Sequence, residues 1–411
     1  TPQRAGRSTG QRSGVIKRSK ISGKSDATSR QISALSHYVT GSMTSAPPLY
    51  LDNNATAPLR AAAIAAMQDA MGPPANPSSV HGFGRAARLR VEDARQAVAG
   101  LAGCSASEVV FTSGGTEANN LVLSQYTHII TTPIEHDSVR AAHPHISFVN
   151  VLADGRVDCD DLKRQLDAVP VAARRQTLLS VMAANNETGV LQPLDDIAEI
   201  AARAEITLHS DMVQAFGKTA MDFAGSGIGY ASLSAHKIGG PSGVGALLVR
   251  PGFGLSSLLK GGGQEQGRRS GTENLIGIAG FGAAAKAASD DPDHYARMAG
   301  WRDAFETQIT RNLPAAQIFG QSVRRLGNTS CIAAGPKAAE TMVMAFDIAG
   351  VAVSAGAACS SGKVQRSHVL DAMGVGDAAA HAIRVSGGWA TKQADFETLA
   401  DVFLRLYKQN A

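Results

Sequence analysis

The stretch Ala231-Ser-Leu-Ser-Ala-His-Lys-Ile-Gly-Gly-Pro-Ser-Gly-Val-Gly-Ala-Leu-Leu-Val249 contains two short apolar runs separated by a glycine-rich turn. Apolar runs of this length, bounded by glycine and proline, are typical of buried strands. Ser234, His236 and Lys237 come where the first strand ends, and open α/β sheets bind ligands at strand ends. A desolvated lysine there is a Schiff-base candidate, whereas a solvated surface lysine is not, and this motif alone leaves both interpretations open.

The alternation of strand and helix patterns extends outward from this stretch over residues 60–293. Strands are expected at 109–112, 128–132, 148–152, 177–183, 206–210, 231–234 and 244–249. Amphipathic helices are expected between them, for example at 85–101, 160–166 and 194–204. This order predicts an α/β fold with a mostly parallel central sheet covered by helices.

Beyond residue 293 the pattern changes. Helices are expected at 301–312, 338–348 and up to residue 407, with strands at 329–333, 351–354 and 383–386. The pattern predicts a large domain over residues 60–293 and a smaller α+β domain formed by 46–59 and 294–411.

The net charge of +4 is unevenly distributed along the 411 residues. Residues 1–42 hold eight basic side chains and one acid, which leaves 31 basic and 34 acidic residues in the rest of the chain. The basicity therefore does not indicate a nucleic-acid-binding fold. We expect residues 1–45 to be a disordered basic tail, either a leader outside the chemistry or an organelle transit peptide.

Four cysteines lie far apart in the sequence, at positions 104, 159, 331 and 359, without a Cys-x-x-Cys pair. Neither a disulfide framework nor a metal site is expected from them. A reducing cytoplasm fits this usage best, with a mitochondrial location as the alternative if the tail is a transit peptide. No apolar run reaches the roughly 18 residues of a membrane span.

Two more motifs lie at expected strand ends. Thr112-Ser-Gly-Gly-Thr-Glu-Ala-Asn-Asn120 leads from a strand through a glycine turn into a helix, which can hold a phosphate on backbone N–H groups or simply cap the helix. His209-Ser-Asp-Met-Val-Gln214 places an acid where it can pair with a pyridinium nitrogen or act as an N-cap. A phosphate cradle, an acid and a lysine in consecutive units are together what a pyridoxal phosphate site needs. A fourth feature, Ala355-Gly-Ala-Ala-Cys-Ser-Ser-Gly-Lys363, is a small-residue loop in which Cys359 is either a reactive thiol or a packing residue.

These motifs together resemble the cysteine desulfurases of the NifS/IscS-like class, which have the fold type I architecture of pyridoxal-phosphate-dependent transferases. The resemblance begins at Tyr50-Leu-Asp-Asn-Asn-Ala-Thr56, includes Glu135-His136 and Asn185-Asn-Glu-Thr-Gly189, and continues through Gly261-Gly-Gly-Gln-Glu-Gln-Gly-Arg-Arg-Ser-Gly-Thr272 to the last helix. The long cysteine loop is similar to that of this class.

The resemblance implies a role for each matching residue. Lys237 forms the Schiff base with pyridoxal 5'-phosphate, Asp211 pairs with its ring nitrogen, Gln214 and Asn186 lie at its ring oxygen, and His136 stacks on the ring. The phosphate is held by Gly115, Thr116, Ser234 and His236, with Thr272 from the other subunit of a homodimer. Arg384 and Asn76 bind the substrate carboxylate, and Cys359 is the catalytic thiol.

The implied activity is conversion of L-cysteine to L-alanine, with the sulfur transferred as a persulfide on Cys359 to an acceptor such as an iron-sulfur scaffold or a tRNA-thiolation enzyme. Two alternatives remain open at this level. One is a selenocysteine lyase, or another lyase or aminotransferase of the same fold; the other is a non-catalytic sulfur-relay module. No nucleic-acid or membrane partner is expected.

Overall fold

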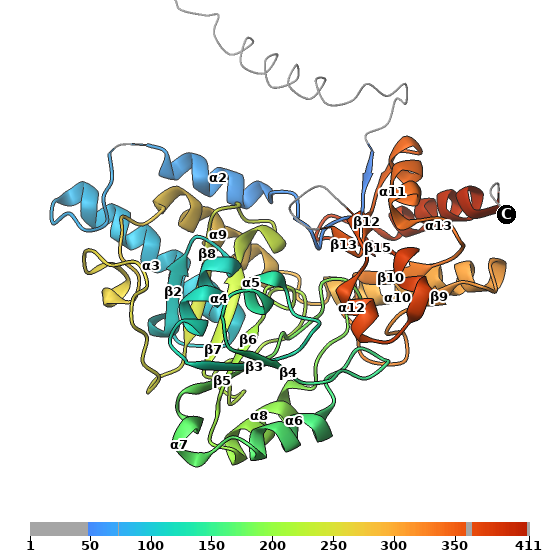
Figure 1. Ribbon diagram of the computed structural model, residues 1–411. Helices are drawn as coiled ribbons and strands as arrows, with labels where there is room; N and C mark the ends of the chain where they lie inside the picture. Colours follow the sequence, from blue (N-terminus) through green and yellow to red (C-terminus); the bar gives the residue numbers. More distant parts are fainter. Residues whose placement is uncertain (1–47, 73, 359–363, 409–411) are drawn as a thin grey trace, which may run out of the picture. The chain divides into compact units, whose positions relative to one another are not determined.

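The central element of the fold is a seven-stranded sheet in a computed structural model that describes residues 48–72, 74–358 and 364–408 (Figure 1). The strands follow the order β2-β8-β7-β6-β5-β3-β4 across the sheet. Their bounds are β2 (Val109–Thr112), β3 (His128–Thr131), β4 (Ile146–Phe148), β5 (Thr177–Ser180), β6 (Thr207–Asp211), β7 (Tyr230–Ser234) and β8 (Gly245–Val249). The pairs from β7 to β4 are all parallel, and β8 runs antiparallel to both of its neighbours. The expected α/β class with a mostly parallel sheet is confirmed.

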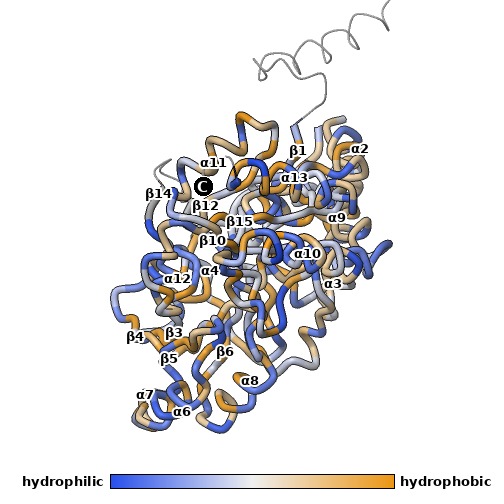
Figure 2. The backbone as a smooth tube through the Cα atoms, turned by 90° about the vertical axis from the view of Figure 1, so that its right-hand side faces the viewer, coloured by the Kyte–Doolittle hydropathy of each residue, from blue (hydrophilic) through white to orange (hydrophobic). Residues whose placement is uncertain are grey.

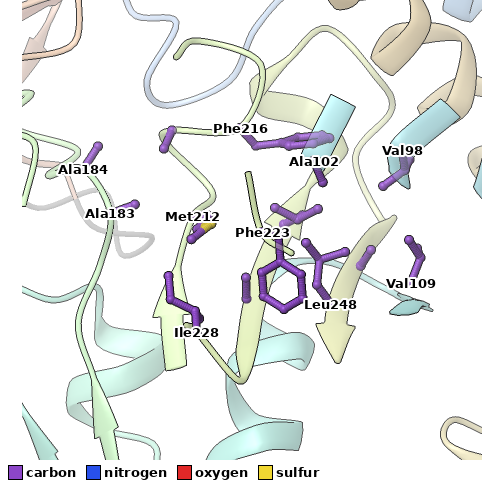
Figure 3. Packing of buried hydrophobic residues seen from close by; sticks show 14 of the residues in the cluster. Val98, Ala102, Val109, Ala183, Ala184, Met212, Phe216, Phe223, Ile228 and Leu248 are labelled. Atoms are coloured by element: carbon purple, nitrogen blue, oxygen red, sulfur yellow. The ribbon is translucent and has the colours of Figure 1, made fainter. Parts of the chain in front are cut away.

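Helices cover both faces of this sheet because successive side chains of each strand point to opposite faces. Val109 and Phe111 of β2 belong to a cluster with α3 (Gly82–Ala102) and α9 (Leu275–Ser289). Val110, between them, packs instead with α4 (Gly115–Leu123). Figure 3 shows the first cluster, in which side chains of α3 lie beside those of the sheet. Burial on both faces explains why the strands read as continuous apolar runs.

The remaining helices of this part are shorter than α3 and α9, with between 4 and 10 residues each. They are α2 (Ala61–Ala70), α5 (Asp137–Arg140), α6 (Cys159–Asp167), α7 (Val171–Arg174) and α8 (Leu194–Arg203). In Figure 2 the colour of α6 and α8 changes between hydrophilic and hydrophobic along each helix, as expected for helices with one buried face. No helix among the described residues is long and apolar enough to cross a membrane.

A second, antiparallel sheet forms toward the C-terminus in the order β12-β15-β10-β9. Its strands are β9 (Gln317–Ile318), β10 (Thr329–Ala333), β12 (Ser354–Ala355) and β15 (Ile383–Ser386). The helices of this region are α10 (His294–Asn312), α11 (Ala339–Ile348), α12 (His368–Ala372) and α13 (Gln393–Lys408). Many of its apolar side chains form a cluster of their own, which Leu51 joins, while those of α12 pack in another cluster with Ile134. The domain boundaries expected from sequence stay a prediction.

Two short pairings connect distant parts of this region, and a third lies at the base of one loop. β1 (Leu49–Tyr50) runs parallel to β11 (Val351–Ala352). Asp52 continues the path as an isolated bridge to Ser386. β13 (Ala357–Ala358) pairs with β14 (Val364–Gln365) at the base of the cysteine loop. The segment from Leu49 to Asp52 is therefore anchored to β11 and β15.

Three expected strands were wrong in detail. The strand expected at 177–183 ends at Ser180 as β5, although Val181 and Ala183 still donate to carbonyl oxygens of β6. The expected strand at 148–152 is β4 at Ile146–Phe148, because the chain leaves the sheet after Val149 donates its N–H to Thr131. The apolar sequence continues beyond the end of β4 because Val149 is buried and Val151 forms an isolated bridge to Val157. The single strand expected at 351–354 is two strands, β11 and β12, that belong to different sheets.

Candidate active site

A cavity of about 440 Å³ lies at the carboxyl ends of β5, β6 and β7. The turn after β2 also lines it. Ten of the residues expected at the site line it, namely Gly115, Thr116, His136, Asn186, Asp211, Gln214, Ser234, His236, Lys237 and Arg384. Nine of them meet because the carboxyl ends of parallel strands lie at one edge of a sheet, whereas Arg384 comes from β15 of the second sheet.

Lys237 follows β7 in a short 3-10 turn, which directs its side chain into the cavity. Its Nζ donates to two main-chain carbonyl oxygens, of Asn54 at 2.6 Å and of Ala55 at 2.7 Å. Burial and the neighbouring Arg384 lower the pKa of Lys237 from 10.5 to about 8, against the opposing effect of two carboxylates. Far more of this amine is therefore unprotonated near neutral pH than of an ordinary exposed lysine, which favours its role as a nucleophile.

The turn between β2 and α4 forms the anion-binding end of the cavity. Gly114 has φ +155°, a conformation that side chains rarely adopt, and a Cβ on Gly115 would lie 2.7 Å from Cγ2 of Val213. The first N–H groups of a helix have no partner within that helix, so the start of α4 offers them to an anion. Burial first, and then Lys237 and Lys218, lower the pKa of His236 to about 4, so this imidazole is neutral.

Asp211 and Gln214 are held by buried partners. Asp211 accepts from the amide of Asn119 at 2.7 Å and from the N–H of Val213 at 3.0 Å. Gln214 donates to the carbonyl oxygen of Asn54 at 2.9 Å, while its Oε1 accepts from Lys218 at 2.7 Å. The acid and the amide are thus oriented before any ligand binds.

Arg384 of β15 is 4% exposed and pairs with Asp52 at 2.6 Å. Its second terminal nitrogen donates to the carbonyl oxygen of Asn186 at 3.2 Å. Its Nε is buried and has no hydrogen-bond partner among the described residues. A guanidinium held in this way can still donate to a carboxylate.

Two expected residues, Asn76 and Thr272, do not line this cavity, and a third lies outside the described residues. Asn76 is exposed and caps its own turn, with Oδ1 accepting from the N–H of Ser78 at 2.9 Å. Thr272 lines a separate hollow of about 230 Å³ beside Thr112 and Ser113. Cys359 lies outside the described residues, although Gly356, at the start of its loop, lines the main cavity.

The sequence analysis assigned no role to several buried polar residues that organise the site. Asn54 is 1% exposed and accepts from Lys237, Gln214 and Lys218 through its two oxygens. Glu135 is fully buried, and burial raises its pKa to about 8. Asn54 lies in the Asp-Asn-Asn-Ala-Thr run, and Glu135 precedes His136. Their position in these motifs was the one feature of the sequence that could have indicated a role at the site.

The donor set of the cavity fits pyridoxal phosphate. An amine with a lowered pKa, a carboxylate fixed by two donors and a free helix start match its aldehyde, ring nitrogen and phosphate. The unpartnered Nε of Arg384 fits the carboxylate of an amino-acid substrate. A mostly parallel sheet with β8 reversed and a lysine after β7 defines the class of fold type I pyridoxal-phosphate-dependent enzymes.

The profile of the Aminotransferase class-V family matches residues 49–399, and the chain belongs to this family. It is 41% identical over 372 residues to a cysteine desulfurase of Cereibacter sphaeroides, covering 86% of this chain and 94% of that protein. An IscS-like cysteine desulfurase of Mycobacterium tuberculosis is 36% identical over 376 residues, which cover 86% of this chain and 94% of that protein. The solved structure of a NifS-like protein from Rickettsia africae superposes with a TM-score of 0.82 at 33% identity, over 88% of this chain and 99% of that one. The resemblance to cysteine desulfurases is confirmed.

Proposed function

We propose that this protein is a pyridoxal-phosphate-dependent cysteine desulfurase that converts L-cysteine to L-alanine. The observation that carries the proposal is Lys237, an amine with a lowered pKa in a cavity shared with Asp211 and Arg384. When bound, the cofactor supplies an electron-withdrawing ring that weakens the bonds at the substrate Cα.

The residues of the chain would bind the cofactor and handle the proton. Asp211 would face the ring nitrogen, Gln214 and Asn186 the ring oxygen, and His136 the ring face. Gly115, Thr116, Ser234 and His236 would hold the phosphate. Lys237 would provide the amine for the cofactor aldehyde and later accept the substrate α-proton at Nζ, which its lowered pKa favours. Arg384 would bind the substrate carboxylate through its free Nε.

Cys359 is the proposed sulfur acceptor. Its Sγ forms a bond to the substrate sulfur while the Cβ–S bond of cysteine breaks, and protons complete the methyl group of alanine. One thiol and one cysteine thereby give one persulfide and one alanine, with the substrate carbon reduced and the sulfur oxidised. A second thiol is then needed to discharge the persulfide.

The proposed assembly is a homodimer in which Thr272 of one subunit joins the phosphate site of the other. Asn76 is proposed to assist Arg384 at the substrate carboxylate. The proposed acceptor is an iron-sulfur scaffold or a tRNA-thiolation protein, as the naming of relatives after IscS and NifS suggests. The proposed compartment is the cytoplasm, which suits the unpaired Cys104, Cys159 and Cys331.

One experiment tests this function directly. The purified protein is incubated with pyridoxal phosphate, L-cysteine and dithiothreitol, alanine and sulfide are measured, and the added sulfur is located by mass spectrometry. We expect Cys359→Ser to bind the cofactor but release no sulfide, and Lys237→Ala to form no alanine. Lys286→Ala, at an exposed helix position, is the matched control. Equal sulfide release by Cys359→Ser and the unmodified protein would contradict the proposal.

A further inference from the structure

Asn119 of α4 is fully buried between two residues that line the cavity, Asp211 and Ser138. Its Nδ2 donates to Oδ2 of Asp211 at 2.7 Å and to Oγ of Ser138 at 2.8 Å. An amide nitrogen carries two hydrogens, so both are used. The opposite orientation would direct Oδ1 at a carboxylate, which the charge of Asp211 opposes.

The orientation of the Asn119 amide determines how Ser138 bonds to His136. Its Oγ accepts from Asn119, so its own hydrogen is free for another acceptor. Nδ1 of His136 lies 2.8 Å from this oxygen. The backbone N–H of Ser138 also donates to Nδ1 at 3.1 Å. Nδ1 therefore accepts twice, and the proton of the neutral imidazole resides on Nε2.

A purely structural role explains only part of this arrangement. His136 is the N-cap of α5, and capping accounts for the bond from the N–H of Ser138 to Nδ1. Capping requires neither the hydroxyl of Ser138 nor an amide that reaches Asp211. Oδ1 of Asn119 is buried and unpartnered among the described residues, so Asn119 is not placed there to satisfy its own polar atoms.

We propose that Asn119 and Ser138 are positioning residues that fix His136 in the Nε2–H tautomer and couple its ring to Asp211. The inference rests on the proposed function, because Asp211 and His136 are the residues expected on the ring nitrogen and ring face of the cofactor. Asp211, Asn119, Ser138 and His136 form one hydrogen-bonded chain along the cavity wall. Through it His136 presents an N–H, not a lone pair, at Nε2.

A double-mutant cycle on cofactor affinity tests the coupling. We expect Ser138→Ala to raise the dissociation constant of pyridoxal phosphate about threefold to tenfold, the loss of one hydrogen bond. In a His136→Ala background the same change should have an effect below about twofold. Asn119→Ala should keep part of its effect in that background, because it also removes a donor from Asp211. Ser138→Thr retains the hydroxyl and should restore affinity.

Ser147→Ala is the matched control, since Ser147 also pairs with a histidine, His128, but at β4 and outside the cavity. Equal effects of Ser138→Ala with and without His136 would overturn the proposal. Absence of cofactor binding by the unmodified protein would instead overturn the proposed function.

A second readout does not depend on the cofactor. Nitrogen-15 NMR of histidine-labelled, cofactor-free protein, assigned with His136→Gln, should show a single Nε2–H tautomer at His136. Ser138→Ala should increase the Nδ1–H population, and Ser138→Thr should not. An Nδ1–H ring in the unmodified protein, or identical spectra for the two variants, would refute the assignment even if Asn119→Ala fails to fold.

Discussion

The Nζ atom of Lys218 lies 2.7 Å from Oε1 of Gln214, in the interior of the protein and without a carboxylate partner among the described residues. Its second acceptor is Oδ1 of Asn54 at 2.9 Å. Burial, reinforced by Lys237 and Arg384, lowers the pKa of Lys218 well below its usual range. The hydrogen bond from Lys218 to Oε1 of Gln214 fixes which end of the Gln214 amide faces the cavity.

Lys218→Met should therefore weaken cofactor binding without removing it. Methionine fills similar space but donates nothing, so the Gln214 amide loses its fixed orientation and Asn54 loses a donor. We expect a dissociation constant for pyridoxal phosphate about 2- to 10-fold higher, as for one lost hydrogen bond. Lys286→Met, at an exposed position, is the control, and an unchanged constant for Lys218→Met would contradict the assigned role.

The lowered pKa of Lys237 predicts a pH dependence that labelling can measure. Only the unprotonated amine reacts with acetic anhydride, so the labelling rate of cofactor-free protein should rise with pH and reach half its maximum near pH 8. An exposed lysine reaches that point near about pH 10.4. Arg384→Gln removes a neighbouring positive charge and should move the midpoint upward. A midpoint near 10 in the unmodified protein would refute the burial argument.

Glu135 predicts a pH-dependent stability. Burial raises its pKa to about 8, so the folded state keeps this proton while the unfolded chain releases it above about pH 4.5. The contribution of Glu135 to the free energy of unfolding is therefore complete below about pH 4.5 and declines as the pH rises toward 8.

Glu135→Gln removes the ionisation and can still accept from Thr132 and Met182. We expect its unfolding free energy to exceed that of the unmodified protein by an amount that grows between pH 5 and pH 8, at most about 1.4 kcal/mol per pH unit. Urea titrations at several pH values measure it, with the exposed Glu340→Gln as control. A difference independent of pH would contradict the assignment.

The contact between Gly115 and Val213 predicts a steric effect and its rescue. Gly115→Ala would bring Cβ to 2.7 Å from Cγ2 of Val213, so one of the two elements must move. We expect weaker cofactor binding, and recovery in Gly115→Ala combined with Val213→Ala. Gly100→Ala adds a Cβ into open space on α3 and is the control. Additive effects in the double variant would exclude the clash as the cause.

Ser367 connects the start of α12 to Glu187, a residue that lines the cavity. Its Oγ accepts from the N–H of Leu370 as the N-cap of α12 and donates to Oε2 of Glu187 at 2.5 Å. Burial raises the pKa of the Glu187 carboxyl, and this hydroxyl opposes that shift. Ser367→Ala should cost about 2 kcal/mol of unfolding free energy, from the lost cap and the lost charge-assisted bond. Ser367→Thr should recover most of it; equal losses in both variants would refute the assignment.

Those parts of the site that lie at the ends of neighbouring strands could be predicted from the sequence. Asp211 and Lys237 end neighbouring parallel strands, so their strand-end positions implied proximity. Asn54 was not assigned a role, because it reaches Lys237 from 183 residues away through a loop whose path no local pattern specifies. Lys218 was missed because lysine is normally a surface residue and only packing shows that this one is buried.

Strand existence was more predictable than strand length. Burial on both faces marked β2 and β7 clearly, whereas the apolar run near residue 150 continued past the end of β4 because Val149 is buried after the chain leaves the sheet. Asn76 and Thr272 lie outside the cavity of the single chain, and their roles stay predictions.

The order in which a ribosome makes this chain conflicts with the order in which the site needs its parts. Asn53 bonds to Ser386, which is 333 residues further along, and β1 finds its partner only at Val351–Ala352. The carbonyl groups that receive Lys237 belong to the same early segment. Newly synthesised chains therefore cannot complete this pocket until the last strands emerge, so the finished site forms only after nearly the whole chain has been made.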